Sequence, residues 1–212
     1  MERSTWEGLK GKLGGRFLAG PLRRGLERWL LGDPWPCLER EVAACPGAVT
    51  AVDLGVGSGY FALRVAARLP QGRVLGVDLS SEMLRQAAAR ARRRGLAERL
   101  TLTRSSVTKT GLPSGAADLV YSNNVLHELS DPGGLWAEAH RLLRPGGRVL
   151  VSDFQTNALT RLAPPLRGAH GAGPYGAAQL REQATAAGFQ EVAVRSVGRW
   201  AVVTGVKAAG PA

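Results

Sequence analysis

A glycine-rich loop and two carboxylates are the first residues whose types and spacing point to chemistry. The loop spans residues 52–59 and reads VDLGVGSG, so that three glycines alternate with other residues behind Asp53. Glycines at such a turn permit positive φ and let a ligand approach the backbone without meeting a Cβ atom. Asp78 follows about 20 residues later, where a carboxylate can accept hydrogen bonds from both hydroxyls of a ribose. Together these residues predict a site for an adenosine compound.

The spacing of the glycines separates the two adenosine compounds that bind at such loops, dinucleotides and S-adenosylmethionine. The dinucleotide pattern G-x-G-x-x-G requires a glycine at position 60, which is Tyr60 in this sequence. The carboxylate of Asp53 suits a cationic amino acid, whereas it would repel a pyrophosphate. The pattern therefore favours S-adenosylmethionine.

Alternating strands and helices must position these residues. Five short apolar runs predict strands at 50–54, 73–78, 100–103, 117–121 and 148–153. Amphipathic helices are predicted between them, including one that starts at Asp131-Pro132 and is broken by the Pro-Gly-Gly at 145–147. Strands that alternate with helices form a parallel sheet covered on both faces. After a helix near 177–187, the runs 189–197 and 200–206 are close enough for a hairpin only. The predicted fold is α/β, with a mostly parallel seven-stranded sheet closed by a C-terminal antiparallel hairpin.

Two regions fall outside this alternation. Residues 1–46 carry a stripe of apolar side chains at helical spacing and are predicted to form an N-terminal helical segment that packs on or covers the site. Residues 47–212 are predicted to form the binding domain. The stretch 157–173 contains Pro164-Pro165 and several glycines, and is either a connector or a lid over the substrate. Its length of about 17 residues favours the lid, because most connections are shorter.

Composition narrows the class of protein. The formal net charge of +11 makes nucleic acid a candidate partner, but the arginines look dispersed and no aromatic residues interleave with them, so a solvated arginine-rich surface is favoured. No apolar run reaches the roughly 20 residues that span a bilayer, and the start of the chain carries no secretory pattern. A cytoplasmic protein with no membrane span is therefore predicted. Cys37 and Cys45 match no zinc or redox spacing, and no metal site is predicted. The oligomeric state stays open.

Four segments in order resemble the class I S-adenosylmethionine-dependent methyltransferases, particularly the small-molecule group related to quinone C-methyltransferases. The segments read VDLGVGSGY, VLGVDLSSEML, ADLVYSNNVLHEL and LRPGGRVLVSDF, and the resemblance covers residues 48–206. It implies a Rossmann-like, doubly wound sheet. It also implies S-adenosylmethionine as the cofactor and S-adenosylhomocysteine as the product.

The resemblance further implies a role for each residue of the cofactor site. Asp53 and the glycine loop would hold the methionine part, Asp78 the ribose, and Leu79 and Met83 would flank the adenine. The family usually carries an acidic residue after the third strand for the adenine amino group, and the matching position here is Ser106, which is expected to discriminate less well. Asn123 and Asn124 would lie near the sulfonium. The predicted cofactor site comprises Asp53, Gly55, Val56, Gly57, Ser58, Gly59, Asp78, Leu79, Met83, Ser106, Val107, Asn123 and Asn124.

His127 is the predicted catalytic residue, because in the family this position follows the fourth strand and faces the reaction chamber. Methyl transfer requires mainly alignment, and a base matters only when the acceptor is a weakly acidic hydroxyl, thiol or carbon acid. His127 is either such a base or substrate orienter, or a histidine that packs or caps at a helix start. His140 is predicted to be exposed. Candidate substrate contacts are Trp6, Tyr60, Phe154, His170 and Tyr175.

Three functions remain open at this point. The first is methyl transfer to a small aromatic, quinone-like or lipid-like acceptor, and the second is RNA methylation or RNA binding through the basic surface. The third is cofactor binding without turnover. Residues 122–125 read SNNV and lack the Pro-Pro-aromatic motif of exocyclic amine methylation, and both cysteines precede the glycine loop, which disfavours cytosine C5 and arsenite chemistry. No appended RNA-binding domain is recognisable, which favours the first function.

Overall fold

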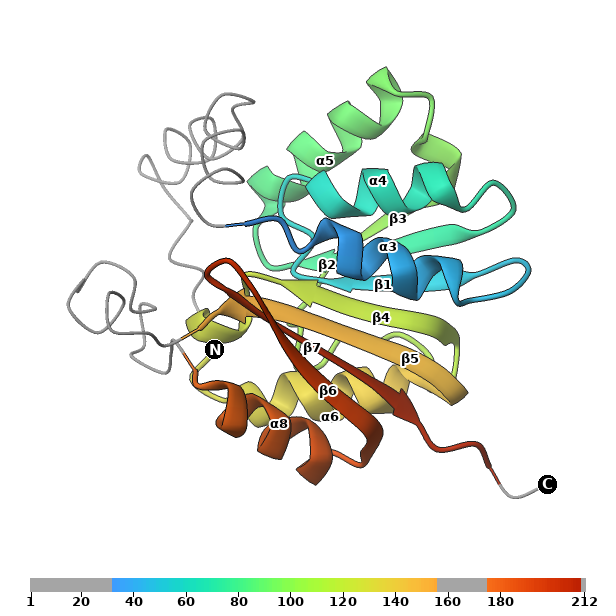
Figure 1. Ribbon diagram of the computed structural model, residues 1–212. Helices are drawn as coiled ribbons and strands as arrows, with labels where there is room; N and C mark the ends of the chain where they lie inside the picture. The colour runs from blue at the N-terminus through green and yellow to red at the C-terminus, as the bar shows by residue number, and fades with distance from the viewer. Residues whose placement is uncertain (1–31, 156–174, 211–212) are drawn as a thin grey trace.

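The computed structural model describes residues 32–155 and 175–210 of the chain, and its elements alternate as the sequence predicts (Figure 1). The strands are β1 (Thr50–Leu54), β2 (Arg73–Asp78), β3 (Leu100–Arg104), β4 (Ala117–Asn123), β5 (Leu143–Phe154), β6 (Phe189–Val197) and β7 (Trp200–Lys207). The helices are α3 (Trp35–Ala43), α4 (Tyr60–Arg68), α5 (Ser81–Arg93), α6 (Pro132–Leu142) and α8 (Ala177–Ala186), with short 3-10 turns η1 (Ala97–Arg99) and η2 (Leu126–Glu128). Two helix starts carry side-chain caps, and Asp131 is at the predicted start. Ser80 accepts from the backbone N–H of Met83, and Asp131 accepts from that of Gly134.

The strands form one sheet in the order β3-β2-β1-β4-β5-β7-β6. The first five pair in parallel, and β7 pairs antiparallel with both β5 and β6. This confirms the mostly parallel seven-stranded sheet with its C-terminal hairpin. The strand order reverses between β1 and β4, and ligands of such sheets bind in the crevice outside the carboxyl ends of the strands at that point.

Helices cover both faces of the sheet. Figure 1 shows α3, α4 and α5 on one face and α6 and α8 on the other. Trp35 and Leu38 of α3 are buried in the same hydrophobic cluster as the inner residues of α4, and Trp136 of α6 is buried in the cluster on the opposite face. The chain before β1 therefore contributes a helix to the main core.

Two local predictions are wrong. β5 begins at Leu143, and residues 145–147 form an irregularity within this strand, because Leu143 pairs with Ala117 while Arg148 already pairs with Leu119. His140 is half-buried: its ring meets Phe189 of β6 edge-to-face, with the centroids 5.2 Å apart. The periodicity of α6 alone could not reveal this contact, because Phe189 comes from a distant part of the sequence.

Several predicted features lie outside the described residues. They include Trp6, His170, most of the N-terminal segment 1–46 and the whole stretch 157–173. Within the part of the chain that the structure describes, no helix is both long and apolar enough to cross a membrane.

Candidate functional site

The carboxyl ends of four parallel strands bring the predicted site residues to one edge of the sheet. Asp53 lies near the end of β1, Asp78 ends β2 and Asn123 ends β4. His127 follows in η2 and reaches the end of β5. Side chains that are far apart in sequence therefore lie at the same end of the strands, where the strand order reverses.

The loop between β1 and α4 depends on its glycines. Gly55, Gly57 and Gly59 have φ of +88°, +50° and +81°, which is left-handed backbone that other residues rarely adopt. A Cβ atom on Gly55 would collide with Val125, and one on Gly59 would lie 3.1 Å from the Cβ of Ala87. A Cβ atom on Gly57 would meet nothing within 4 Å. Gly57 therefore faces the open side of the loop, whereas the other two glycines are packed against the protein.

Asp78 is fixed in place by the backbone around it. One carboxylate oxygen accepts from the N–H of Gly57 and the other from the N–H of Ser80, both at 2.8 Å. Burial raises the pKa of Asp78, and the backbone N–H groups of Ser80, Gly57 and Leu79 act against that rise. A carboxylate has about four acceptor positions, so a fixed Asp78 still has positions for a ligand's hydroxyl groups.

Asp53 is a buried acid without a cationic partner among the described residues. Its side chain is nearly inaccessible, and burial raises its pKa to about 8. The neighbouring Tyr121 hydroxyl lowers this pKa and the charge of Asp78 raises it. The Tyr121 hydroxyl lies near Asp53 but has no hydrogen-bond partner among the described residues. A buried carboxyl group beneath a glycine loop is a ready counter-ion for a cation held above it.

Three buried side-chain atoms in the described part of the chain have no hydrogen-bond partner there. They are the Tyr121 hydroxyl, the Asn123 amide nitrogen and the Tyr175 hydroxyl. Tyr121 and Asn123 belong to the end of β4, and Tyr175 bridges Gln155 directly after β5. Leaving such a group unpaired costs about 1–3 kcal/mol, so these three atoms are candidates for hydrogen bonds to a ligand bound at this edge.

His127 and Asp153 form a buried pair at the same edge. The Nδ1 atom of His127 lies 2.8 Å from one Asp153 oxygen, and the backbone N–H of His127 donates to the other at 3.0 Å. Burial alone would lower the pKa of His127. The hydrogen bond and the charge of Asp153, with a smaller effect of Glu128, more than offset burial, so the pKa is raised. Asp153 thereby fixes the ring so that Nε2 faces away from it, 3.9 Å from a carboxylate oxygen of Glu128.

An aromatic wall continues from this pair. The ring of Phe154 meets His127 edge-to-face at 5.9 Å and stacks on Trp200 at 4.5 Å. Phe154 and Trp200 are both half-buried, and the indole N–H of Trp200 donates to the carbonyl of Gly32. Phe154, a predicted substrate contact, thus lies beside His127. The pKa of Tyr175 is raised, mainly by burial and to a smaller extent by the charge of Asp153.

The other predicted site residues differ in the exposure and the hydrogen bonds of their side chains. Val56 and Val107 are buried in the core, so that only their backbone atoms could meet a ligand. Leu79 and Met83 are partly exposed, and Asn124 is exposed with a φ of +61°. The Ser106 hydroxyl lies 2.9 Å from that of Thr108, within its own turn. The Tyr60 hydroxyl accepts from Arg64 at 2.8 Å.

Three residues at this edge are absent from the sequence-based prediction. Asp153 and Tyr121 are the last residues of predicted strands, and the same signal that singles out Asp78 could have found them. Arg90 donates to the carbonyl and hydroxyl oxygens of Ser58 in the glycine loop, at 3.0 and 2.7 Å. Its sequence context is an arginine-rich helix and gives no such indication.

Comparison with known proteins finds relatives for the part of the chain that includes the glycine loop, Asp78 and His127. A family model described as a methyltransferase domain matches residues 52–151. The malonyl-acyl-carrier-protein O-methyltransferase of Hahella chejuensis is 32% identical over 141 residues, covering 66% of this chain and 48% of that protein. The trans-aconitate 2-methyltransferase of Methylobacterium radiotolerans is 37% identical over 128 residues, covering 60% of this chain and 46% of that protein. The chain spans about half the length of these curated relatives.

Solved structures share the fold at lower identity. A SAM-dependent methyltransferase from Aquifex aeolicus superimposes with a TM-score of 0.72 at 22% identity, over 92% of this chain and 97% of that one. The cyclase SpnF superimposes with a TM-score of 0.69 at 23% identity, over 82% of each chain. Because a cyclase shares the fold, the reaction has to be argued from the residues at the crevice.

Proposed function

The chain belongs to the class I S-adenosylmethionine-dependent methyltransferase family, and from that premise we propose that it transfers a methyl group from S-adenosylmethionine to a small-molecule acceptor. The observation that carries the proposal is the glycine loop, which follows the buried Asp53 and is tied to Asp78. The amide of Gly57 holds the Asp78 carboxylate, and Gly57 itself faces open space.

The residues at the crevice fit each part of this cofactor. Asp78 is suited to the ribose hydroxyls, because both of its oxygens are already oriented by backbone N–H groups. Asp53 is suited to the α-ammonium group of the methionine part, which would supply the cation that it lacks. Leu79 and Met83 are partly exposed beside Asp78 and are suited to the adenine ring. Ser106 remains the candidate for the adenine edge.

His127 is the group proposed to act on the acceptor. S-adenosylmethionine supplies a methyl group already activated on a sulfonium, so the protein mainly has to align the acceptor with it. For a hydroxyl acceptor, His127 Nε2 would take the proton while Asp153 stabilises the resulting imidazolium through Nδ1. The charge of Asp153 raises the pKa of His127 and so makes this nitrogen a stronger base.

Replacement of His127 by alanine is expected to slow methyl transfer about 100-fold or more without weakening cofactor binding, since a general base contributes about 10²–10⁴-fold. The rate of the wild-type protein should rise with pH through the raised pKa of His127. Asp153→Asn should move that rise to lower pH, because it removes the groups that raise the pKa. The pH dependence of single turnover measures both effects.

His140→Ala, which removes a histidine packed on Phe189, is the matched control and should leave transfer unchanged. Normal turnover of His127→Ala would remove His127 from the mechanism.

A carboxylate acceptor would reverse the sign of this pH dependence. An ionised carboxylate needs no base, and a protonated His127 would instead orient it through its charge. The rate would then fall as pH rises through the pKa of His127. The two curated relatives are named for transfer to malonyl and trans-aconitate groups, which supports including carboxylates beside phenols and quinols among the acceptors tested. The stacked Phe154 and Trp200 favour an acceptor with a planar face.

The glycine loop offers a paired test of the cofactor site. Gly57→Ala is expected to abolish most S-adenosylmethionine binding, because the new methyl group enters the space assigned to the ligand, while the left-handed backbone costs only about 1–2 kcal/mol of stability. Gly55→Ala should lower the free energy of unfolding by more than Gly57→Ala does, because it adds a collision with Val125 to the same strain. Chemical denaturation and cofactor titration of both variants check this. Unchanged affinity in Gly57→Ala would contradict the assignment.

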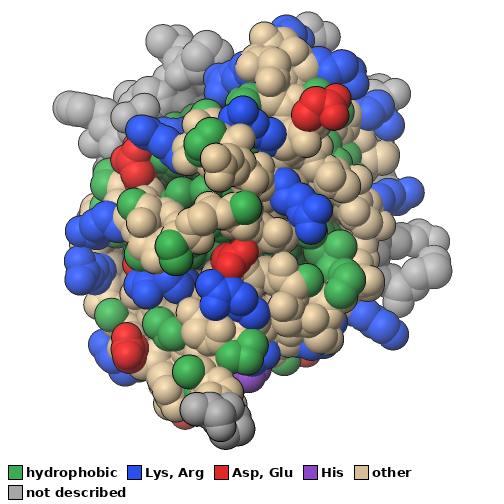
Figure 2. All heavy atoms as spheres, turned by 90° about the vertical axis from the view of Figure 1, so that its right-hand side faces the viewer, with side chains coloured by type: hydrophobic (Ala, Val, Ile, Leu, Met, Phe, Trp, Pro, Cys, Tyr) green, Lys and Arg blue, Asp and Glu red, His purple; other side chains and the backbone are tan. Residues whose placement is uncertain are grey.

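One basic face of the molecule lies away from the candidate site. Figure 2 shows the side of the molecule where the parallel strands begin, with Lys and Arg side chains spread over it and few Asp or Glu side chains between them. Arg73 opens β2 on this side, and Arg144 lies near the start of β5, where it pairs with Asp118. His127 lies beyond the opposite ends of these strands. A polyanion held by the face in Figure 2 would not present its bases to His127.

The proposal is tested first by titrating the protein separately with S-adenosylmethionine and with NAD. Binding of S-adenosylmethionine alone, at micromolar affinity, is expected for a site that selects a cationic amino acid over a pyrophosphate. Methyl transfer to a panel of phenols, quinols and carboxylic acids then defines the acceptor class. Cofactor binding with no turnover on any acceptor would favour a binding protein, and failure to bind would refute the proposed function.

A further inference from the structure

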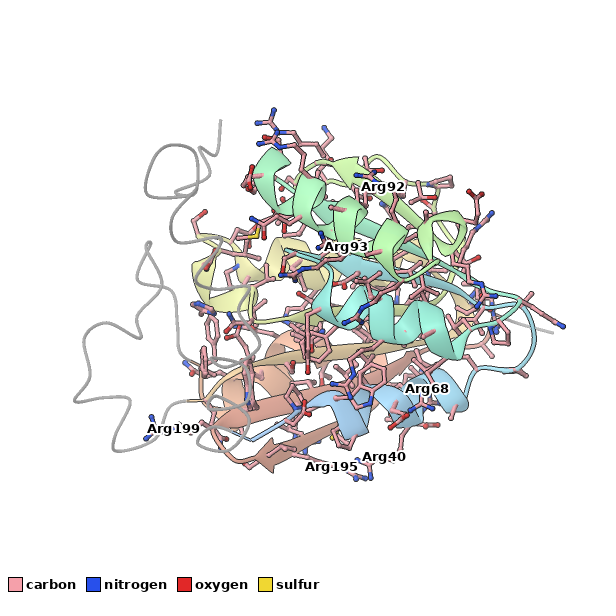
Figure 3. All side chains as sticks on the ribbon, turned by 90° about the horizontal axis from the view of Figure 1, so that it is seen from above. Arg40, Arg68, Arg92, Arg93, Arg195 and Arg199 are labelled. Atoms are coloured by element: carbon pink, nitrogen blue, oxygen red, sulfur yellow. The ribbon has the colours of Figure 1, made fainter. Side chains whose placement is uncertain are left out.

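Arg90 is set apart from the other arginines of α5 by its contacts. Its Nη1 atom donates to the Ser58 carbonyl at 3.0 Å and to the Ser58 hydroxyl at 2.7 Å, across 32 positions of sequence. Arg92 and Arg93 are exposed on the same helix, where Figure 3 labels them, and have no partner among the described residues. Arginines in the last turn of a helix are accounted for by the partial negative charge there. Arg90 instead reaches the loop.

Arg90 contacts the part of the loop where glycines leave the backbone free to rotate. Ser58 lies between Gly57 and Gly59, both with positive φ, so the chain on either side of it can rotate at little steric cost. The peptide that joins Ser58 to Gly59 is held at both ends. Its carbonyl accepts from Arg90, and its N–H donates to the carbonyl of Val56 at 2.9 Å. Loss of Arg90 would free one end of this peptide.

A second observation joins the loop to the same face of α5. A Cβ atom on Gly59 would lie 3.1 Å from the Cβ of Ala87, so the loop backbone is packed directly on the helix. Ala87 and Arg90 are three residues apart and therefore share one helix face. On the other side of the loop, the Gly57 amide is held by Asp78. The loop is thus tied to β2 and to α5 through neighbouring residues.

We propose that Arg90 is a positioning residue for the cofactor loop, which it holds in its binding conformation through Ser58 before the cofactor arrives. The inference rests on the proposed function for its consequence, since the ordered loop is the part that meets the methionine group. Ordering the loop in the free protein removes an entropy cost that binding would otherwise carry. Arg90 does not touch the reacting atoms, and its effect falls on affinity.

The variants Arg90→Ala and Arg90→Lys test this, with Arg92→Ala and Arg93→Ala as controls that lose the same charge from the same helix. Hydrogen exchange of residues 55–61 in the ligand-free protein reports the order of the loop directly. Titration with S-adenosylmethionine and with S-adenosylhomocysteine reports affinity.

Arg90→Ala is expected to speed exchange in the loop and to raise both Kd values roughly tenfold, since the loss of a hydrogen bond to a charged group changes an equilibrium by about that factor. Arg90→Lys, with one cationic donor, should recover part of the loss. The rate at saturating cofactor should be unchanged, which separates positioning from catalysis.

A Ser58→Ala variant completes a cycle with Arg90→Ala. Because the hydroxyl contact depends on Arg90, the double variant should be little weaker than Arg90→Ala alone. The inference is overturned if loop exchange and affinity in Arg90→Ala match those in Arg92→Ala and Arg93→Ala. It is also overturned if all three lose affinity equally, since charge alone would then be responsible. If the wild-type protein binds neither S-adenosyl compound, the proposed function fails, and hydrogen exchange still decides whether Arg90 orders the loop.

Discussion

Asp78→Ala is expected to raise the Kd for S-adenosylmethionine at least about 100-fold, equivalent to about 2.7 kcal/mol. The variant loses the acceptor proposed for the ribose hydroxyls, and hydrogen bonds to a charged group are worth about 1.5–3 kcal/mol each. It also releases the Gly57 amide, which Asp78 holds at 2.8 Å. Calorimetric titration of the purified variant measures the effect.

Two further variants make this result specific. Asp78→Asn keeps one acceptor oxygen and should bind with intermediate affinity. Asp118→Ala removes an acid that pairs with Arg144 and accepts from the backbone of Thr50, at the opposite edge of the sheet. Its affinity for the cofactor should match that of the wild type. Wild-type affinity in Asp78→Ala would refute the assignment of the ribose site.

Asp53→Asn is expected to stabilise the ligand-free protein above about pH 4 and to weaken cofactor binding at the same time. The pKa of Asp53 rises from its usual 3.8 to about 8 on folding, chiefly through burial. Between these values the unfolded chain carries a carboxylate while the folded chain keeps the proton, so the free energy of unfolding falls as pH rises from about 4 to about 8. Asparagine carries no such penalty, and its curve should be flatter across that range. Denaturant titrations at several pH values measure the slope.

The binding half of this prediction follows from the ammonium group assigned to Asp53. A cation beside the carboxyl group favours its ionised form, so cofactor binding near pH 7 should release a proton to the buffer. The binding enthalpy should then depend on the ionisation enthalpy of the buffer, and Asp53→Asn should abolish that dependence along with most of the affinity. Equal affinity and equal buffer dependence in wild type and variant would contradict the role of Asp53.

Most of the fold follows from patterns that are local in the sequence. The apolar runs, the helix start at Asp131, and the short gap before Trp200 predict the strand and helix order correctly. The two errors arise where a distant segment decides the outcome. β5 begins before residues 145–147 because Leu143 pairs with Ala117 of β4, and His140 is half-buried because Phe189 of β6 packs on it. Neither contact has a signal in the neighbouring sequence.

The candidate site was predictable to the extent that it depends on strand ends. Asp78, the glycine loop and His127 are prominent because of residue type and position. Asp153 and Arg90 differ, since what matters in each is one contact across the fold. The contact of Asp153 is with the His127 ring, 26 positions away, and that of Arg90 is with Ser58. Asp153 stands at the end of a predicted strand, as Asp78 does, but neither that position nor an arginine on a charged helix reveals which distant residue is the partner.

The strand β7 lies inside the sheet, between β5 and β6, although it follows both in the sequence. It pairs with β5 along residues 200–206 and with β6 on its other side. During synthesis β5 therefore presents an open row of N–H and C=O groups until these late residues arrive. Open edges of this kind are templates for strands of other chains. The interval before β7 inserts is thus the stage at which the growing protein is most exposed to aggregation, and the stage at which a chaperone would be of most use.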